Sequence, residues 1–165
     1  MEFDRQISRR LHEEHRATID LWGRLEQALA TRARSWPPTG LDPDLDSALR
    51  ACAAALAQEV SRHFAFEEAE LFPRLAAAGE GDIAELLAEE HEAIRSAAAQ
   101  FSQLLTVAAS GSLDASGWQR LRTVALELAE RLFAHVQKEE MSLLPALEDL
   151  LDDETDTALA LSYGS

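Results

Sequence analysis

Two stretches of this sequence repeat the same pattern of side chains that can bind a metal ion. One begins at His63 and reads HFAFEEAELFPRL, and the other begins at His135 and reads HVQKEEMSLLPAL. Both place a histidine, two adjacent glutamates, a leucine and a proline at the same spacing. Imidazole and carboxylate groups without thiolate suit iron, manganese, zinc and similar ions. The repeat therefore indicates metal chemistry, and the interleaved phenylalanines are expected to wall a buried site.

A second pair of histidines also repeats. His15 ends the stretch LHEEH and His91 ends LAEEH, so that both follow Leu-x-Glu-Glu. Leu11 and Ile19 lie one helical turn to either side of His15 and place it on an apolar face. His91 has apolar neighbours at similar spacing. We expect both histidines on the inward faces of helices.

The carboxylate four residues after a histidine shares its helix face, and this applies to both longer stretches. A lone histidine on an apolar face is usually a core residue with a hydrogen-bonded partner, but here four of the five histidines occupy equivalent positions of a repeat. Inward carboxylates without partners are costly to bury, and a bound cation removes that cost. Six ligands suit two ions better than one closed zinc site. The candidate ligands are His15, His63, Glu67, His91, His135 and Glu139.

The pattern does not decide the roles of two further residues near these ligands. Glu70 returns to the face of His63 seven residues later and could be a labile ligand, but Ser142 takes its place in the second copy. His12 precedes His15 by three residues and is expected at the surface or behind a ligand. No Glu-x-x-His occurs in the sequence, which argues against a ferritin-like di-iron class.

Long helices must carry these residues, because good helix formers dominate and only 7 glycines and 5 prolines interrupt them. Asp42 and Asp82 are expected to cap helix starts. The breakers SWPPTG, AAGEG and SGSLDASG separate four segments, which predicts an all-α, up-down-up-down four-helix bundle. The predicted helices span about 4–34, 44–78, 82–109 and 115 or 118 to 151.

The chain reads as two copies of one helical hairpin, because the first and third helices correspond, as do the second and fourth. We predict one domain, a bundle over residues 1–151, followed by an acidic C-terminal tail over 152–165. The tail is expected to be frayed or to form a short extra helix.

Composition excludes several classes of partner. The net charge of −15 argues against nucleic acid and against anionic membrane surfaces. No apolar run approaches the ~20 residues of a membrane span, and the N-terminus lacks the apolar core of a signal peptide. The single cysteine, Cys52, cannot form an intrachain disulfide and is expected in the core. A cytoplasmic protein is the expectation.

The ordered set of histidines and glutamates resembles the hemerythrin-like family, also called HHE cation-binding proteins, over about residues 11–150. The trailer Glu-Glu-x-x-Leu-Phe/Leu-Pro after His63 and His135 is typical of it. The resemblance implies a hemerythrin-like bundle around a non-haem di-iron centre, bridged by oxo or hydroxo and by two carboxylates. Manganese or zinc could substitute. The resemblance implies that His15 and His63 bind one iron, that His91 and His135 bind the second, and that Glu67 and Glu139 bridge them.

The resemblance does not decide which of two adjacent glutamates is the last carboxylate ligand. Glu140 is a near alternative to Glu139, because oxygen-carrying members space the last carboxylate one residue further on. Glu139 is preferred, since it repeats Glu67 and since a residue five after the histidine rotates away from its face. Glu68 is expected in solvent or behind a ligand.

One departure bears on function. Oxygen-carrying members have His-x-x-x-His on the third helix, but Arg95 stands four residues after His91 here. The six-ligand set instead resembles di-iron proteins linked to nitric-oxide defence. The implied function is binding of, or reaction with, a small oxidant such as oxygen, nitric oxide or peroxide in stress defence, with enzymatic turnover left open. The alternative is an iron- or gas-responsive sensor or regulatory module without turnover. A monomer or a homodimer is expected.

Overall fold

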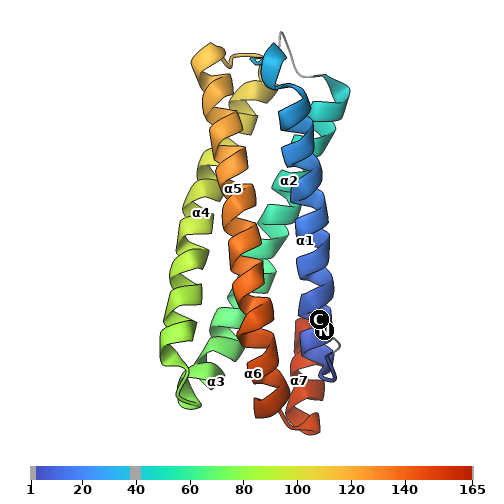
Figure 1. Cartoon of the computed structure of the whole chain (residues 1–165), viewed down its shortest axis with the longest axis vertical. Helices are drawn as coiled ribbons and strands as arrows, with labels where there is room; N and C mark the ends of the chain where they lie inside the picture. The colour runs from blue at the N-terminus through green and yellow to red at the C-terminus, as the bar shows by residue number, and fades with distance from the viewer. Residues whose placement is uncertain (1–2, 38–41, 165) are drawn as a thin grey trace.

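Four long helices run side by side in the computed structural model, which describes residues 3–37 and 42–164 (Figure 1). The chain ascends, descends, ascends and descends again, and the described residues contain no strand. The predicted all-α, up-down-up-down four-helix bundle is therefore confirmed. Its long helices are α1 (Gln6–Thr31), α2 (Pro43–Gln58), α4 (Gly81–Ala109) and α5 (Ala115–Met141).

The second leg of the bundle departs from a regular α-helix. After α2 the chain forms two π-helical stretches, Glu59–Phe64 and Glu67–Leu71, and then α3 (Phe72–Ala77). Such wider turns are rare and often occur at functional sites. The matching part of α5 in the second copy of the repeat stays α-helical. The two copies therefore differ in backbone geometry at their shared motif.

Helix starts follow local chemistry at two places. Asp42 caps α2 as predicted, because its carboxylate accepts a hydrogen bond from the Leu45 amide at 2.8 Å. Asp114 caps α5 by accepting from the Gly117 amide at 2.7 Å. A short turn, Ala33–Ser35, follows α1, and most of the predicted SWPPTG break lies outside the described residues.

The predicted cap at Asp82 is wrong. Glu80 occupies the cap position of α4, without a side-chain cap, and Asp82 lies inside the first turn. The Glu80 amide still donates to the Leu75 carbonyl of α3 at 3.0 Å, so the connection closes before Asp82 is reached. Gly79 makes that turn with φ of +97°, a conformation that favours glycine.

The fourth predicted helix is interrupted. It ends at Met141, and α6 (Leu143–Leu150) begins after Ser142. Pro145 has no amide hydrogen to donate to the carbonyl four residues earlier, and its ring clashes with that carbonyl, which explains the break at Met141.

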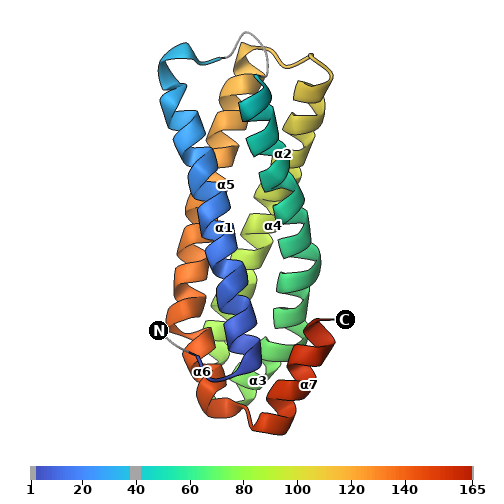
Figure 2. The same cartoon turned by 90° about the vertical axis from the view of Figure 1, so that its right-hand side faces the viewer.

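The C-terminal segment forms a helix, α7 (Asp153–Tyr163), that lies against α1 (Figure 2). Its Asp156 is buried and accepts hydrogen bonds from the amides of Gln6 at 2.9 Å and Ile7 at 3.0 Å. Since the first amides of a helix lack partners within it, Asp156 acts as the cap of α1 from 150 residues away.

Two apolar clusters fill the bundle and leave a polar layer between them. One contains Trp22 and Phe101, and the other contains Leu11 and Leu147. Cys52 is buried in the first cluster, as predicted. The described residues contain no helix long and apolar enough to cross a membrane.

The expectation for Ile19 is wrong, because its side chain is 40% exposed. Thr18 and Trp22 take the inward positions on that part of α1. An offset of four residues advances an α-helix by slightly more than one turn, so Ile19 rotates out of the layer that His15 occupies.

Candidate metal centre

One layer of buried polar side chains crosses the bundle between the two apolar clusters. All four legs of the bundle contribute to it, and the two legs that carry the longer repeat each give a histidine and a glutamate. Every member is at most 2% exposed to solvent. The members are His15 of α1, His63 and Glu67 of the π-helical stretches, His91 of α4, and His135 and Glu139 of α5.

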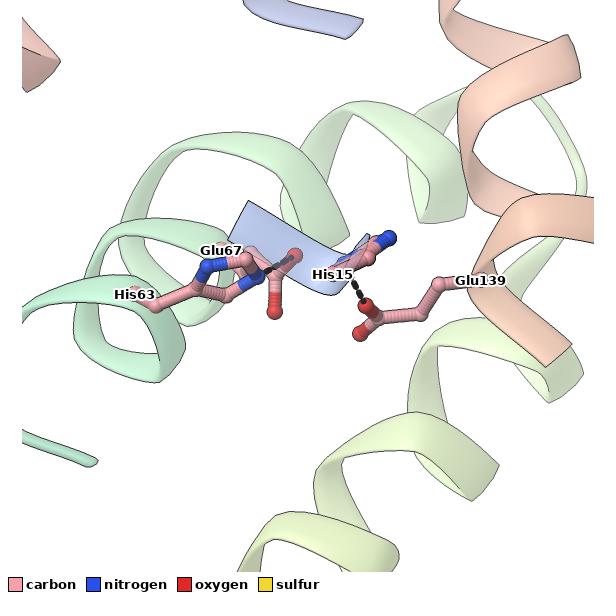
Figure 3. A group of neighbouring side chains, drawn as sticks. All are labelled: His15, His63, Glu67 and Glu139. Carbon is pink, nitrogen blue, oxygen red and sulfur yellow. Dashed lines mark hydrogen bonds and ion pairs between the residues drawn. The ribbon is translucent and has the colours of Figure 1, made fainter. Parts of the chain in front are cut away.

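The six side chains form two overlapping groups of four. Within each group, one nitrogen or oxygen atom of every member lies within 4.8 Å of those of the others. Glu67 and Glu139 belong to both groups. Figure 3 shows the first group, with its side chains converging from three legs of the bundle. His15 and His63 complete this group, and His91 and His135 complete the other.

The inward contacts are short in both groups. In one, His63 Nε2 lies 3.0 Å from a Glu67 oxygen. In the other, His135 Nε2 lies 2.9 Å from a Glu139 oxygen and 2.9 Å from His91 Nε2. Two imidazole nitrogens and a carboxylate that converge in this way offer lone pairs to one cation.

Several inward atoms lack a hydrogen-bond partner. They are His15 Nε2, one oxygen of Glu67 and both oxygens of Glu139, although His15 Nε2 lies 2.8 Å from a Glu139 oxygen without suitable hydrogen-bond geometry. No lysine or arginine pairs with either carboxylate within the described ranges. Burying such groups is costly unless a charge compensates them. Imidazole and carboxylate donors suit borderline divalent ions, so the residues present fit a metal.

Each histidine is held from the outside by a glutamate at its Nδ1 atom. Because a carboxylate only accepts hydrogen bonds, the Nδ1 nitrogen must carry a proton, so Nε2 is the atom that faces inward and can bind a cation once any proton on it is displaced. Such partners orient metal-binding histidines and raise their basicity. The pairs are His15 with Glu140 at 2.6 Å, His63 with Glu14 at 2.9 Å, His91 with Glu68 at 2.7 Å, and His135 with Glu90 at 2.9 Å.

These outer glutamates, which are Glu14, Glu68, Glu90 and Glu140, follow the repeat. Glu14 and Glu90 come directly before a candidate ligand in the two Leu-x-Glu-Glu-His stretches, and each holds a histidine of the following leg. The sequence reasoning gave neither a role, although their repeated position was visible. Glu68 lies behind His91, in line with one of its two expected positions.

The residues whose roles the sequence pattern did not decide lie outside both groups of four. Glu140 points to the outer side, where it also meets His12 Nδ1 at 2.9 Å. Glu70 is 43% exposed at its side chain and lies 3.6 Å from Arg74. Arg95, which stands at the place of a fifth histidine, donates to Glu68 at 2.8 Å.

Charge within the layer shifts the acidity of its members. Burial by itself lowers the pKa of His15 and His135, but nearby carboxylates, above all Glu139, outweigh it and raise the pKa to about 9 and about 10. Burial by itself raises the pKa of Glu139, but the histidines around it hold that pKa well below its usual value. Without a cation the layer therefore retains protons that a metal must displace.

Aromatic side chains wall one side of the layer. Phe64 stacks on the His91 ring with centroids 3.7 Å apart and an angle of 8° between the planes. Beside His63, α7 brings Tyr163, whose hydroxyl donates to Glu14 and lies 3.3 Å from His63 Nδ1. A cavity of about 210 Å³ adjoins these last three side chains. No local sequence pattern predicted the position of Tyr163.

Comparison with known proteins agrees with this geometry. The family model for the hemerythrin HHE cation binding domain matches residues 6–157, a range that includes all six side chains of the layer and the outer glutamates. No curated protein matches the chain.

Proposed function

The chain belongs to the hemerythrin HHE cation-binding family, and from this premise we propose that it is a non-haem di-iron protein that binds or reacts with a small oxidant such as oxygen, nitric oxide or peroxide. The proposal includes a role in stress defence. One observation carries the proposal: two buried carboxylates, Glu67 and Glu139, are shared by two groups of four side chains and pair with no lysine or arginine among the described residues.

In this proposal one pair of histidines would hold each metal, and the two central glutamates would be shared between the two positions. Manganese or zinc can replace iron, because the donor atoms suit all three. His15 and His63 would hold one ion, His91 and His135 would hold the other, and Glu67 and Glu139, which belong to both groups, would contribute to both.

A pair of iron ions bound here would supply redox chemistry toward a small ligand. The protein supplies orientation, because the outer glutamates fix the proton at Nδ1 of each histidine. It also limits water, since the layer lies between two apolar clusters and Phe64 covers the His91 ring.

Arg95 favours oxidant chemistry over reversible oxygen carriage in this proposal. Oxygen-carrying relatives place a fifth histidine where Arg95 stands, and its guanidinium is engaged with Glu68 and Glu92 rather than with the layer. Neither group of four contains a further nitrogen ligand in the part of the chain that is described.

Metal analysis with an optical spectrum tests the proposal. We expect two iron ions per chain after anaerobic loading, and near-ultraviolet absorption from oxo-bridged iron after oxidation. His63→Ala should abolish this absorption, whereas His12→Ala should leave the iron content nearly unchanged, because His12 contacts Glu140 and not the layer. Substoichiometric iron in the parent protein would exclude a di-iron function.

A regulatory module without turnover is the second candidate, and the contact of α7 with the layer favours it. Tyr163 lies 3.3 Å from His63 Nδ1, so a change at this histidine can alter the seat of α7. Stoichiometric iron without turnover, together with a gas-dependent change in proteolysis of α7, would support this candidate over an enzyme.

A further inference from the structure

The two halves of the centre have equivalent inner side chains but different outer partners. In the half that contains His91 and His135, both outer glutamates contact permanent cations. Arg95 donates to both oxygens of Glu68, at 2.8 and 2.9 Å. The ammonium group of Lys138 pairs with Glu90, the glutamate that holds His135.

The half that contains His15 and His63 lacks such cations. Its outer glutamates meet an imidazole and a phenol instead, because His12 lies 2.9 Å from Glu140 and the Tyr163 hydroxyl donates to Glu14. No lysine or arginine forms an ion pair with either glutamate over residues 3–37 and 42–164.

Other charges near the two halves do not reverse this contrast. Glu59 lies 3.9 Å from His63 Nδ1 and adds a third carboxylate to the half without cations. Arg62 stacks on the Tyr163 ring at 4.5 Å and donates to the Tyr163 carbonyl. Its charge contributes to lowering the pKa of Glu14, after the hydrogen bonds from His63 and Tyr163, but it forms no ion pair with this carboxylate. In the other half, Glu92 shares Arg95 but is largely exposed, so solvent screens its charge.

Outer charge acts on a bound cation through the imidazole. An uncompensated carboxylate at Nδ1 increases the electron density at Nε2 and attracts a divalent ion directly, whereas a cation paired with that carboxylate cancels much of both effects. The six inner side chains are at most 2% exposed, so the difference between the halves acts on a bound ion through buried imidazoles. The outer glutamates themselves are 22–36% exposed at their side chains, and solvent reduces their direct effect.

We infer that the two metal positions are unequal, and that a divalent cation fills the position at His15 and His63 before the position at His91 and His135. This inference rests on the proposed function. Arg95 and Lys138 are the residues that weaken the second position, and the affinities of the two steps should differ by about tenfold or more, the size of effect that outer partners have on metal sites.

Calorimetric titration of the metal-free 165-residue chain with zinc at constant ionic strength tests the inference. Two resolved steps are expected. Lys138→Gln keeps a hydrogen-bond donor for Glu90 but removes the charge, so it should tighten the weaker step and leave the stronger step unchanged. Arg131→Gln is the matched control, because Arg131 lies on the same helix, pairs with Glu127 and is 44% exposed at its side chain against 43% for Lys138.

The reverse substitution tests the other half. His12→Lys places a permanent cation against Glu140, so it should weaken the stronger step and bring the two affinities together. Two steps of equal affinity in the parent chain would overturn the inference while leaving a two-metal site intact, and so would an equal response of both steps to Lys138→Gln. Absence of zinc binding would overturn the proposed function as well.

Discussion

Glu14 of α1 accepts a hydrogen bond at 2.9 Å from Nδ1 of His63, which lies on the next leg of the bundle. Glu14 directly precedes His15 in the sequence. One short segment of α1 therefore provides an inward histidine and a glutamate that orients the histidine of the next leg. Glu90 does the same for His135 from α4. The outer glutamates therefore tie the four legs together around the layer.

Glu14→Gln should lower metal affinity without unfolding the protein. The amide oxygen still accepts from Nδ1 of His63 but carries no charge, so it polarises the imidazole less, and changes of such an outer partner typically cost about 10- to 100-fold in affinity. Calorimetric zinc titration measures the change. Glu13→Gln removes the same charge from the exposed neighbouring position and is the control, for which the isotherm should stay the same. Equal losses in both variants would show that net charge, not the contact with His63, is responsible.

Metal removal should destabilise the fold. A metal that binds only the native state raises the free energy of unfolding. The increase is about 2.7 kcal/mol when the free metal concentration is roughly 100 times the Kd. The central carboxylates Glu67 and Glu139 are buried without a lysine or arginine partner in the described part of the chain, which adds strain when the cation is absent. Thermal unfolding with and without a chelator checks this. An unchanged melting temperature would favour a structural bundle with vestigial histidines.

The metal-free protein should lose stability as pH rises above neutrality. The pKa of His15 is raised from 6.5 to about 9 and that of His135 to about 10. Because these folded-state values exceed the unfolded value, the contribution to stability is complete below about pH 6.5 and is lost as pH rises through about 9 to 10. Urea unfolding of the chelator-treated protein across this range measures the slope.

Metal should abolish that pH dependence, because a coordinated Nε2 atom no longer takes up a proton. Zinc-loaded protein in the same urea series is the comparison, and its affinity for zinc should increase over the range in which the metal-free form loses protons. A metal-free protein that gains stability between about pH 7 and 10 would contradict the assigned pKa directions.

Asp156→Asn should weaken the attachment of α7 to α1. The two oxygens of the Asp156 carboxylate each accept from one amide, of Gln6 and of Ile7, and asparagine has only one carbonyl oxygen. One amide therefore loses its acceptor, which costs about 1–3 kcal/mol when the donor is buried. Urea unfolding measures the loss. Asp153→Asn is the control on the same helix, since Asp153 is fully exposed and pairs only with Arg5 among the contacts described. A similar loss in both variants would contradict a capping role.

Much of the fold followed from local pattern. Breakers and helix-forming composition predicted four helical legs, because backbone preference acts within a few residues. The errors lie where tertiary contacts compete with that preference. Asp82 does not cap α4, because the turn after α3 places Glu80 at the cap position. The π-helical stretch that begins at Glu59 could not be predicted, because the spacing of its residues is also compatible with an α-helix.

The candidate site followed from the repeat for the same reason. A histidine and a glutamate four residues apart share a helix face wherever the helix goes, and equivalent positions of two hairpins come to similar heights in a bundle. The structure brings all six candidate ligands into one layer. Glu70, which the same periodicity returned to the face of His63, lies partly exposed beside Arg74 instead, because the π-helical stretch rotates it outward.

The sequence by itself determined the helices, their order and the inward histidines and glutamates, because helical periodicity is a local property of the chain. Only the tertiary structure decided which outer glutamate holds which histidine and which cation or phenol backs it. Tyr163 and Glu14 are 149 residues apart and meet because α7 folds back onto α1. Such contacts depend on the rotation and register of packed helices, which no single helix encodes.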